Sequence, residues 1–133
     1  MIVDSSALIA ILKREPEWAA ISKTLDSALT ARISAATYLE TSIVVDGWKN
    51  PILSREFDEL IKRFDILIEP VTAEQARIAR QAYRDYGKGS GHPAGLNFGD
   101  CFSYALAMEQ REPLLWKGDD FGHTDIRPAV TER

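Results

Sequence analysis

The chain has 133 residues, which predicts a single domain spanning residues 1–133, and its 45% hydrophobic and 27% charged residues exclude a wholly disordered protein. Its formal net charge of −4, from 20 acidic against 16 basic residues, excludes binding of polyanions through overall charge. One cysteine excludes an internal disulfide and a cysteine-cluster metal site. With no signal-peptide pattern and no apolar run near the ~20 residues that span a membrane, this composition predicts a cytoplasmic protein.

Short apolar runs alternate with amphipathic segments along the chain. We predict, in chain order, a strand at 2–3, helices at 7–12 and 18–25, a strand at 32–34, helices at 35–47 and 57–64, a strand at 66–68, a helix at 72–86, a glycine-rich loop at 87–95, a helix at 97–108, a strand at 114–116 and a brief edge strand at 126–128. This alternation predicts an α/β fold with a mostly parallel central sheet flanked by helices on both faces. Ligands of such folds bind beyond the carboxyl ends of the strands.

Four carboxylates lie near that predicted edge of the sheet. Asp4 closes the first strand, and Glu40 lies about two turns into the helix after the second strand. Asp100 is in the first turn of the helix after the glycine-rich loop, and Asp119 follows the last strand. Asp120 stands next to Asp119 and is the alternative for the fourth position.

Each of these acids also has a purely structural interpretation. Asp4 can cap a helix, and both Thr37-x-x-Glu40 and Asn97-x-x-Asp100 resemble capping boxes. The fourth acid lies in a turn sequence. If the fold brings the acids together, however, their repulsion requires protonation or bound cations. Oxygen ligands without His or Cys favour Mg²⁺ or Mn²⁺, an arrangement that suits cleavage of a phosphodiester.

Other reactive side chains have weaker contexts. His92 and His123 could support metal-free acid–base catalysis, but neither lies on a regular element, so we expect surface or substrate contacts. Cys101 has apolar neighbours and is predicted to be a buried packing thiol. Trp48 lies in an apolar turn between two helices, where core packing is the default and a partner contact is the alternative.

A basic stripe follows one face of the helix at 72–86. It comprises Arg77, Arg80 and Arg84, and Lys88 extends it. The stripe is either a solvated helix face or a track for a phosphate backbone leading to the acidic residues.

Four segments resemble PIN-domain ribonucleases, and in order and spacing they are similar to VapC-type toxins of bacterial toxin–antitoxin pairs. They are IVDSSAL at 2–8, SAATYLE at 34–40, GHPAGLNFGDC at 91–101, and residues 114–126. The resemblance implies a single PIN-like domain that acts as a metal-dependent endoribonuclease on structured RNA, tRNA or rRNA, through hydroxide attack on a phosphodiester. It also implies Mg²⁺ as cofactor, with Mn²⁺ as a substitute, inhibition by a cognate antitoxin, and a homodimer.

The same resemblance assigns roles to residues of this chain. Asp4, Glu40, Asp100 and Asp119 are the implied catalytic and metal-binding acids, and Ser5 or Ser6 would orient a water or a carboxylate. The number of metal ions, one or two, stays open.

Two other classes of protein remain as alternatives. A phospho-accepting receiver domain needs adjacent acids after its first strand and an aspartate after its third, whereas here the first strand yields one acid and the third ends in Glu69-Pro70. A binding module whose acids are only helix caps would bind no Mn²⁺.

Overall fold

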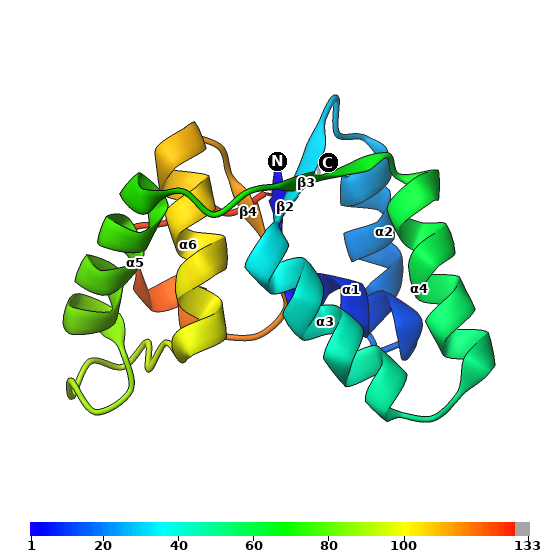
Figure 1. Ribbon diagram of the computed structural model, residues 1–133, viewed down its shortest axis with the longest axis horizontal. Coiled ribbons are helices and arrows are strands. Elements are labelled where there is room, and N and C mark those ends of the chain that lie inside the picture. The colour runs from blue at the N-terminus through cyan, green and yellow to red at the C-terminus, as the bar shows by residue number, and fades with distance from the viewer. Residues whose placement is uncertain (130–133) are drawn as a thin grey trace.

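The computed structural model describes residues 1–129 as an α/β fold with six α-helices and a four-stranded parallel sheet (Figure 1). The predicted α/β class is therefore confirmed. The elements are β1 (Ile2–Val3), α1 (Ser5–Leu12), α2 (Trp18–Asp26), β2 (Ala31–Ser34), α3 (Ala35–Gly47), α4 (Pro51–Arg63), β3 (Ile66–Glu69), α5 (Ala73–Tyr86), α6 (Phe98–Gln110), β4 (Leu114–Leu115) and a 3₁₀ turn, η1 (Asp120–His123). None of the described helices is long and apolar enough to cross a bilayer.

The strands lie in the order β3-β2-β1-β4, and every pair is parallel. Ile2 pairs with Arg32 on one side and with Leu114 on the other. Because the strands are parallel, their carboxyl ends meet at one edge of the sheet. The segments that follow β1, β2 and β4 therefore start from the same edge.

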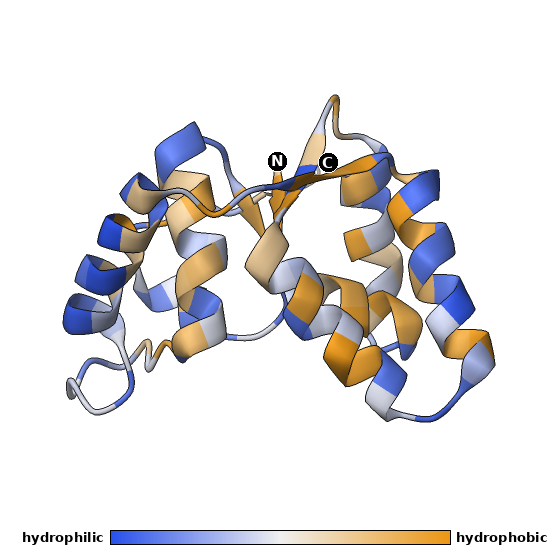
Figure 2. Cartoon of the chain, in the orientation of Figure 1, coloured by the Kyte–Doolittle hydropathy of each residue, from blue (hydrophilic) through white to orange (hydrophobic). Residues whose placement is uncertain are grey.

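Helices cover both faces of the sheet, and the two residues of β1 show why. Side chains alternate along a strand, so Val3 packs with α1, α2, α3 and α4, while Ile2 packs with α5 and α6. Figure 1 shows these two helical layers on either side of the strands. In Figure 2 the outward side of α5 is hydrophilic, whereas α3 keeps apolar positions exposed, namely Leu39 (58%) and Ile43 (64%).

Most helices begin at a polar cap that the sequence supplies. Side-chain oxygens accept hydrogen bonds from the first-turn N–H groups in five helices, at Asp4, Ser34, Asn50, Thr72 and Asn97. Asn97 and Asp100 form the predicted capping box at the start of α6.

Some local predictions differ from the structure. The Thr37-x-x-Glu40 capping box is wrong, because Ser34 at the end of β2 caps α3 and Thr37 already lies inside the helix. The helix predicted at 57–64 begins six residues earlier, at Pro51, because Asn50-Pro51 both follows α3 and opens α4. The edge strand predicted at 126–128 is reduced to a single parallel bridge between Leu114 and Pro128.

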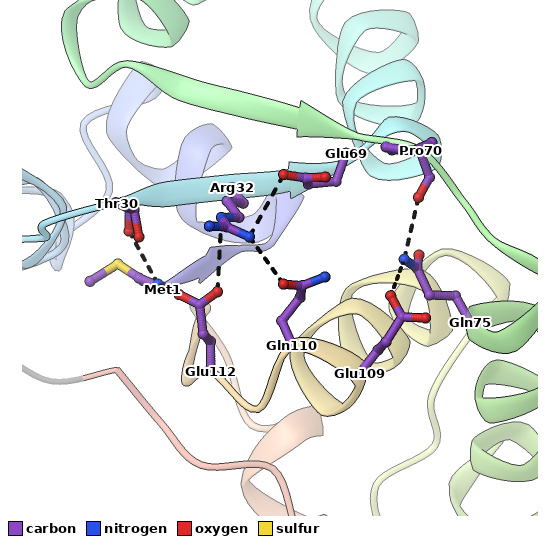
Figure 3. Close-up of polar contacts among 9 residues, drawn as sticks. All are labelled: Met1, Thr30, Arg32, Glu69, Pro70, Gln75, Glu109, Gln110 and Glu112. Carbon is purple, nitrogen blue, oxygen red and sulfur yellow. Dashed lines mark hydrogen bonds and ion pairs between the residues drawn. The ribbon is translucent and has the colours of Figure 1, made fainter.

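A polar network surrounds Arg32 near the amino-terminal ends of β1 and β4 (Figure 3). The ammonium group of Met1 pairs with Glu112. The Arg32 guanidinium donates to Gln110 Oε1 at 3.0 Å and lies 3.8 Å from Glu69 and 3.9 Å from Glu112. Through Arg32, these contacts link β2 with the end of β3 and with the end of α6, and through Met1 they reach the start of β1.

Candidate active site

Asp4 is held in a fixed orientation where β1 passes into α1. Asp4 is buried, with only 2% of its surface exposed. Oδ2 accepts hydrogen bonds from the N–H and the hydroxyl of Ser6, at 3.1 and 2.7 Å, and Oδ1 accepts one from the hydroxyl of Ser103 at 2.5 Å. The Ser6 hydroxyl also accepts from the N–H of Lys117 at 3.0 Å, which ties the segment after β4 to Asp4. Asp4 thus caps a helix and also presents a rigid carboxylate.

Two buried hydroxyls behind Asp4 were missed by the sequence analysis. Ser103 of α6 is fully buried, and its oxygen lies 3.3 Å from the hydroxyl of Thr37 in α3, which is 1% exposed. Thr41 donates to the carbonyl of Thr37 at 2.7 Å. Because the Ser103 hydroxyl donates a hydrogen bond to Oδ1, it helps to fix the orientation of the Asp4 carboxylate. No sequence pattern indicated this contact, since Asp4 and Ser103 are 99 residues apart.

Glu40 on α3 lies within electrostatic range of Asp4. Burial raises the pKa of Glu40, the charge of Asp4 raises it further, and a hydrogen bond with the Ser5 side chain lowers it. The Glu40 carboxylate also rests against the backbone of Gly99, because a Cβ added at Gly99 would collide with Glu40 Oε2. Gly99 therefore leaves the space that Glu40 occupies.

Asp100 in the first turn of α6 is the third acid at this place. Its Oδ2 accepts a hydrogen bond from the Asn97 N–H at 3.0 Å. Burial raises the pKa of Asp100 to about 6, against the lowering effect of that hydrogen bond, and the charges of Asp4, Asp120 and Glu40 raise it as well. The fold has therefore brought three of the predicted acids close enough to affect one another's ionisation.

A small cavity of about 120 Å³ lies beside Asp4 and Asp100, and Glu40 is not among its lining residues. Asp4 and Asp100 line it from one side, and Asp119 and Asp120 line it from the turn after β4. Asp119 and Asp120 are both exposed. Of the two, Asp120 is the residue whose charge raises the pKa of Asp100, an observation that favours Asp120, although Asp119 was preferred from the sequence.

The donor set fits a hard divalent cation. Within residues 1–129, no three or more His, Cys, Asp or Glu side chains are grouped closely enough to form a ready-made metal cage. Mg²⁺, however, usually takes one or two protein carboxylates and keeps several waters. Asp4 and Asp100 line one cavity and repel each other, as expected of two carboxylates that share a cation.

The remaining candidates lie outside the acidic cavity. His92 accepts a hydrogen bond from the Ala94 N–H at 3.1 Å and packs edge-on against Tyr86, and His123 is exposed. Burial raises the pKa of Cys101 to about 11, the opposite of what a nucleophilic thiol requires. Trp48 is half-buried against the core, with the Lys13 ammonium 4.9 Å from its ring.

The predicted basic residues are all exposed and do not line the acidic cavity. Arg77 pairs with Glu74 at 3.4 Å, and Lys88 lies in the turn after α5. Arg80 and Arg84 line a different concave surface, between α5 and α6.

The raised pKa of Asp100 predicts how pH affects stability without metal. The folded protein keeps this proton up to about pH 6, whereas an unfolded aspartate loses it near pH ~3.9. The folded state binds more protons between these values, so the free energy of unfolding falls as pH rises from about 4 to 6. Asp100→Asn should remove the contribution of Asp100 to this dependence, while that of Glu40, whose pKa is also raised, remains. At pH 7 in EDTA the variant should be more stable by about 1–2 kcal/mol, a modest value because solvent partly screens the carboxyl.

Urea denaturation in EDTA across pH 4–8 measures this effect. Asp58→Asn, a change of an exposed carboxylate on α4, is the matched control and should follow the unmodified protein. Identical pH profiles for Asp100→Asn and the unmodified protein would contradict the electrostatic description of the site.

Comparison with known proteins agrees with this arrangement. The family model described as "PIN domain" matches residues 1–127. Ribonuclease VapC28 of Mycobacterium tuberculosis is 59% identical over 133 residues, which is the full length of both chains. The fold is similar to that of VapC20 of the same organism, a structure titled as a sarcin–ricin loop cleaving toxin (TM-score 0.74, 15% identity, 98% of each chain). It is also similar to a toxin–antitoxin complex from Klebsiella pneumoniae (TM-score 0.66, 16% identity, 90% of this chain and 88% of the other).

The family match and the full-length identity agree with the cluster of acids at the carboxyl edge of the sheet. The chain belongs to the PIN-domain family and, within it, to the VapC ribonucleases.

Proposed function

We propose that this protein is a Mg²⁺-dependent endoribonuclease, with Mn²⁺ as a substitute, that cuts structured RNA such as tRNA or rRNA. The observation that carries the proposal is the clustering of Asp4, Glu40 and Asp100, in which burial and neighbouring negative charge raise the pKa values of Glu40 and Asp100. Such mutual repulsion disfavours the folded state unless a cation offsets it, so its presence favours a metal site over simple helix caps.

The surroundings of each acid indicate its role in the proposed reaction. Asp4 and Asp100 would bind the cation, because both line the cavity and Asp4 is fixed by Ser6 and Ser103. A bound divalent cation would supply Lewis acidity, which makes an attacking water easier to deprotonate and balances charge on the phosphodiester.

The other acids would assist the reaction without binding the cation directly. Glu40, steadied by Ser5, would accept a proton at its carboxylate oxygen. Asp119 or Asp120 would hold water at the rim of the cavity. In-line attack would leave 3′-hydroxyl and 5′-phosphate ends.

The relatives support the class of substrate and partner. VapC20 is titled as a sarcin–ricin loop cleaving toxin, and the Klebsiella structure is a toxin–antitoxin complex. We therefore extend the proposal to a structured RNA substrate and a cognate antitoxin as inhibitor. From the resemblance to VapC-type toxins we add a homodimer and a cytoplasmic location.

The test is cleavage of purified tRNA and rRNA in Mg²⁺, Mn²⁺ or EDTA, combined with melting curves over a Mn²⁺ titration. We expect discrete fragments with 5′-phosphates in either metal and none in EDTA, and a Tm that rises with Mn²⁺ because the ion binds the folded state. Intact RNA in all three conditions, together with an unchanged Tm, would identify a binding module whose acids only cap helices.

A further inference from the structure

A second concave surface, which we call the aromatic groove, lies between α5 and α6. It has a volume of about 380 Å³, and the residues that matter to the argument are Arg80, Tyr83, Arg84, Phe98 and Phe102. The two helices lie side by side in Figure 1, with the start of α6 next to the end of α5. The size of the groove is within the range of small-molecule sites, ~300–1,000 Å³.

The groove offers aromatic rings to solvent. Phe98, the first residue of α6, is 77% exposed, and Phe102 one turn later meets its ring edge-on with centroids 4.9 Å apart. Tyr83 of α5 is 43% exposed on the other side. Exposed rings around an apolar hollow suit a flat, aromatic ligand that can stack on them.

Two arginines without counterions border the groove and line it with their aliphatic stems. Arg80 and Arg84 are exposed and form no ion pair with any residue in the range 1–129, whereas Arg77 on the same helix pairs with Glu74. Guanidinium groups bind phosphates through paired N–H donors and stack on planar rings. Proteins bind single-stranded nucleic acids with this combination of aromatic rings and arginines.

The position of the groove connects it to the acidic site. Phe98 is followed directly by Gly99, which contacts Glu40, and then by Asp100, which lines the acidic cavity. Phe98 and Asp100 are two residues apart in the first turn of α6, so their side chains point to different sides of the helix. An RNA strand that reaches both must therefore pass over the start of α6.

We propose that the aromatic groove binds an unpaired nucleotide of the RNA, across the start of α6 from the acidic cavity. The base stacks on Phe98, and Arg80 and Arg84 hold the adjoining backbone. This inference rests on the proposed ribonuclease function and adds a requirement to it, namely that the RNA has an unpaired nucleotide within reach of the groove when it is bound at the acidic cavity. The free arginines favour this occupant over an apolar protein segment, which would leave both guanidinium groups without an anion.

Fluorescence anisotropy in EDTA tests the proposal, because binding is then measured without cleavage. The probes are a short fluorescein-labelled single-stranded RNA and a labelled, fully paired RNA duplex. Phe98→Ala should weaken binding of the single strand at least about fivefold, leave binding of the duplex unchanged, and leave the salt dependence unchanged. Phe98→Trp keeps an aromatic ring at this position and should bind the single strand as tightly as the unmodified protein does. Arg80→Gln and Arg84→Gln should each lower the salt slope by about 1.

Two changes on α4 provide matched controls. Ile52→Ala removes an exposed apolar side chain (64% exposed), and Arg55→Gln removes an exposed guanidinium. Both should bind the single strand as the unmodified protein does. Unchanged affinity of Phe98→Ala overturns the proposal, and if that variant instead changes its elution in size-exclusion chromatography, the groove is a contact between two copies of the chain. Failure of the nuclease proposal would be seen separately, as absence of cleavage in Mn²⁺ by the unmodified protein.

Discussion

Asp4→Asn is expected to lower RNA cleavage at least about 100-fold while the protein remains folded. The amide oxygen can still accept the hydrogen bond from the Ser6 N–H that caps α1, but the residue no longer carries a charge that binds a cation. Loss of that charge also lowers the pKa of Glu40 and of Asp100, since Asp4 raises both. Single-turnover cleavage in Mn²⁺ measures the first effect, and melting in EDTA checks that the fold is intact.

Asp4→Ala separates the cap from the charge. It removes the acceptor as well, so it should lose a similar amount of activity and also about 1 kcal/mol of stability. Asp26→Asn, at the end of α2 and away from the cavity, is the control and should cleave normally. Cleavage at the unmodified rate by both Asp4→Asn and Asp100→Asn would rule out the proposed metal ligands.

Gly99→Ala should lower cleavage about 10- to 100-fold without unfolding the protein. The new methyl group would collide with the carboxylate of Glu40, which is the flexible end of a long side chain and can move aside. The helix itself tolerates alanine, which is favoured over glycine by roughly 0.5–1 kcal/mol. Cleavage rates and urea denaturation together measure the result.

Gly47→Ala is the matched control for that change. Gly47 ends α3, and a Cβ added there would meet nothing within 4 Å. Its activity should equal that of the unmodified protein. A fully active Gly99→Ala variant would show that the observed position of Glu40 is not needed for cleavage.

Local sequence patterns were sufficient for much of the fold. Alternating apolar runs gave the strands and helices, and the parallel arrangement then placed the ends of β1, β2 and β4 at one edge. The Asn97–Asp100 capping box was predicted correctly, because it depends only on neighbours along the chain. The Thr37–Glu40 box was wrong for a different reason: Ser34 caps α3 instead, and the local pattern does not say where β2 ends.

Contacts between distant elements could not be predicted in this way. The hydroxyl of Ser103 reaches Asp4, and Gly99 reaches Glu40, only because α6 packs against α3 and the end of β1. The basic stripe was visible in the sequence. That two of its members, Arg80 and Arg84, line one groove with Phe98 depends on how α5 packs on α6. The choice between Asp119 and Asp120 depends on the backbone of one turn, which composition does not specify.

The hydroxyls of Thr37 and Ser103 have a consequence for how this enzyme can diverge. They connect helices from opposite faces of the sheet directly behind Asp4, so the direction of that carboxylate depends on the spacing of those helices. Substitutions of uncharged core residues that alter this spacing therefore change reactivity without touching an ionisable group. Catalytic strength in such proteins can drift through packing alone, even when every acid is retained.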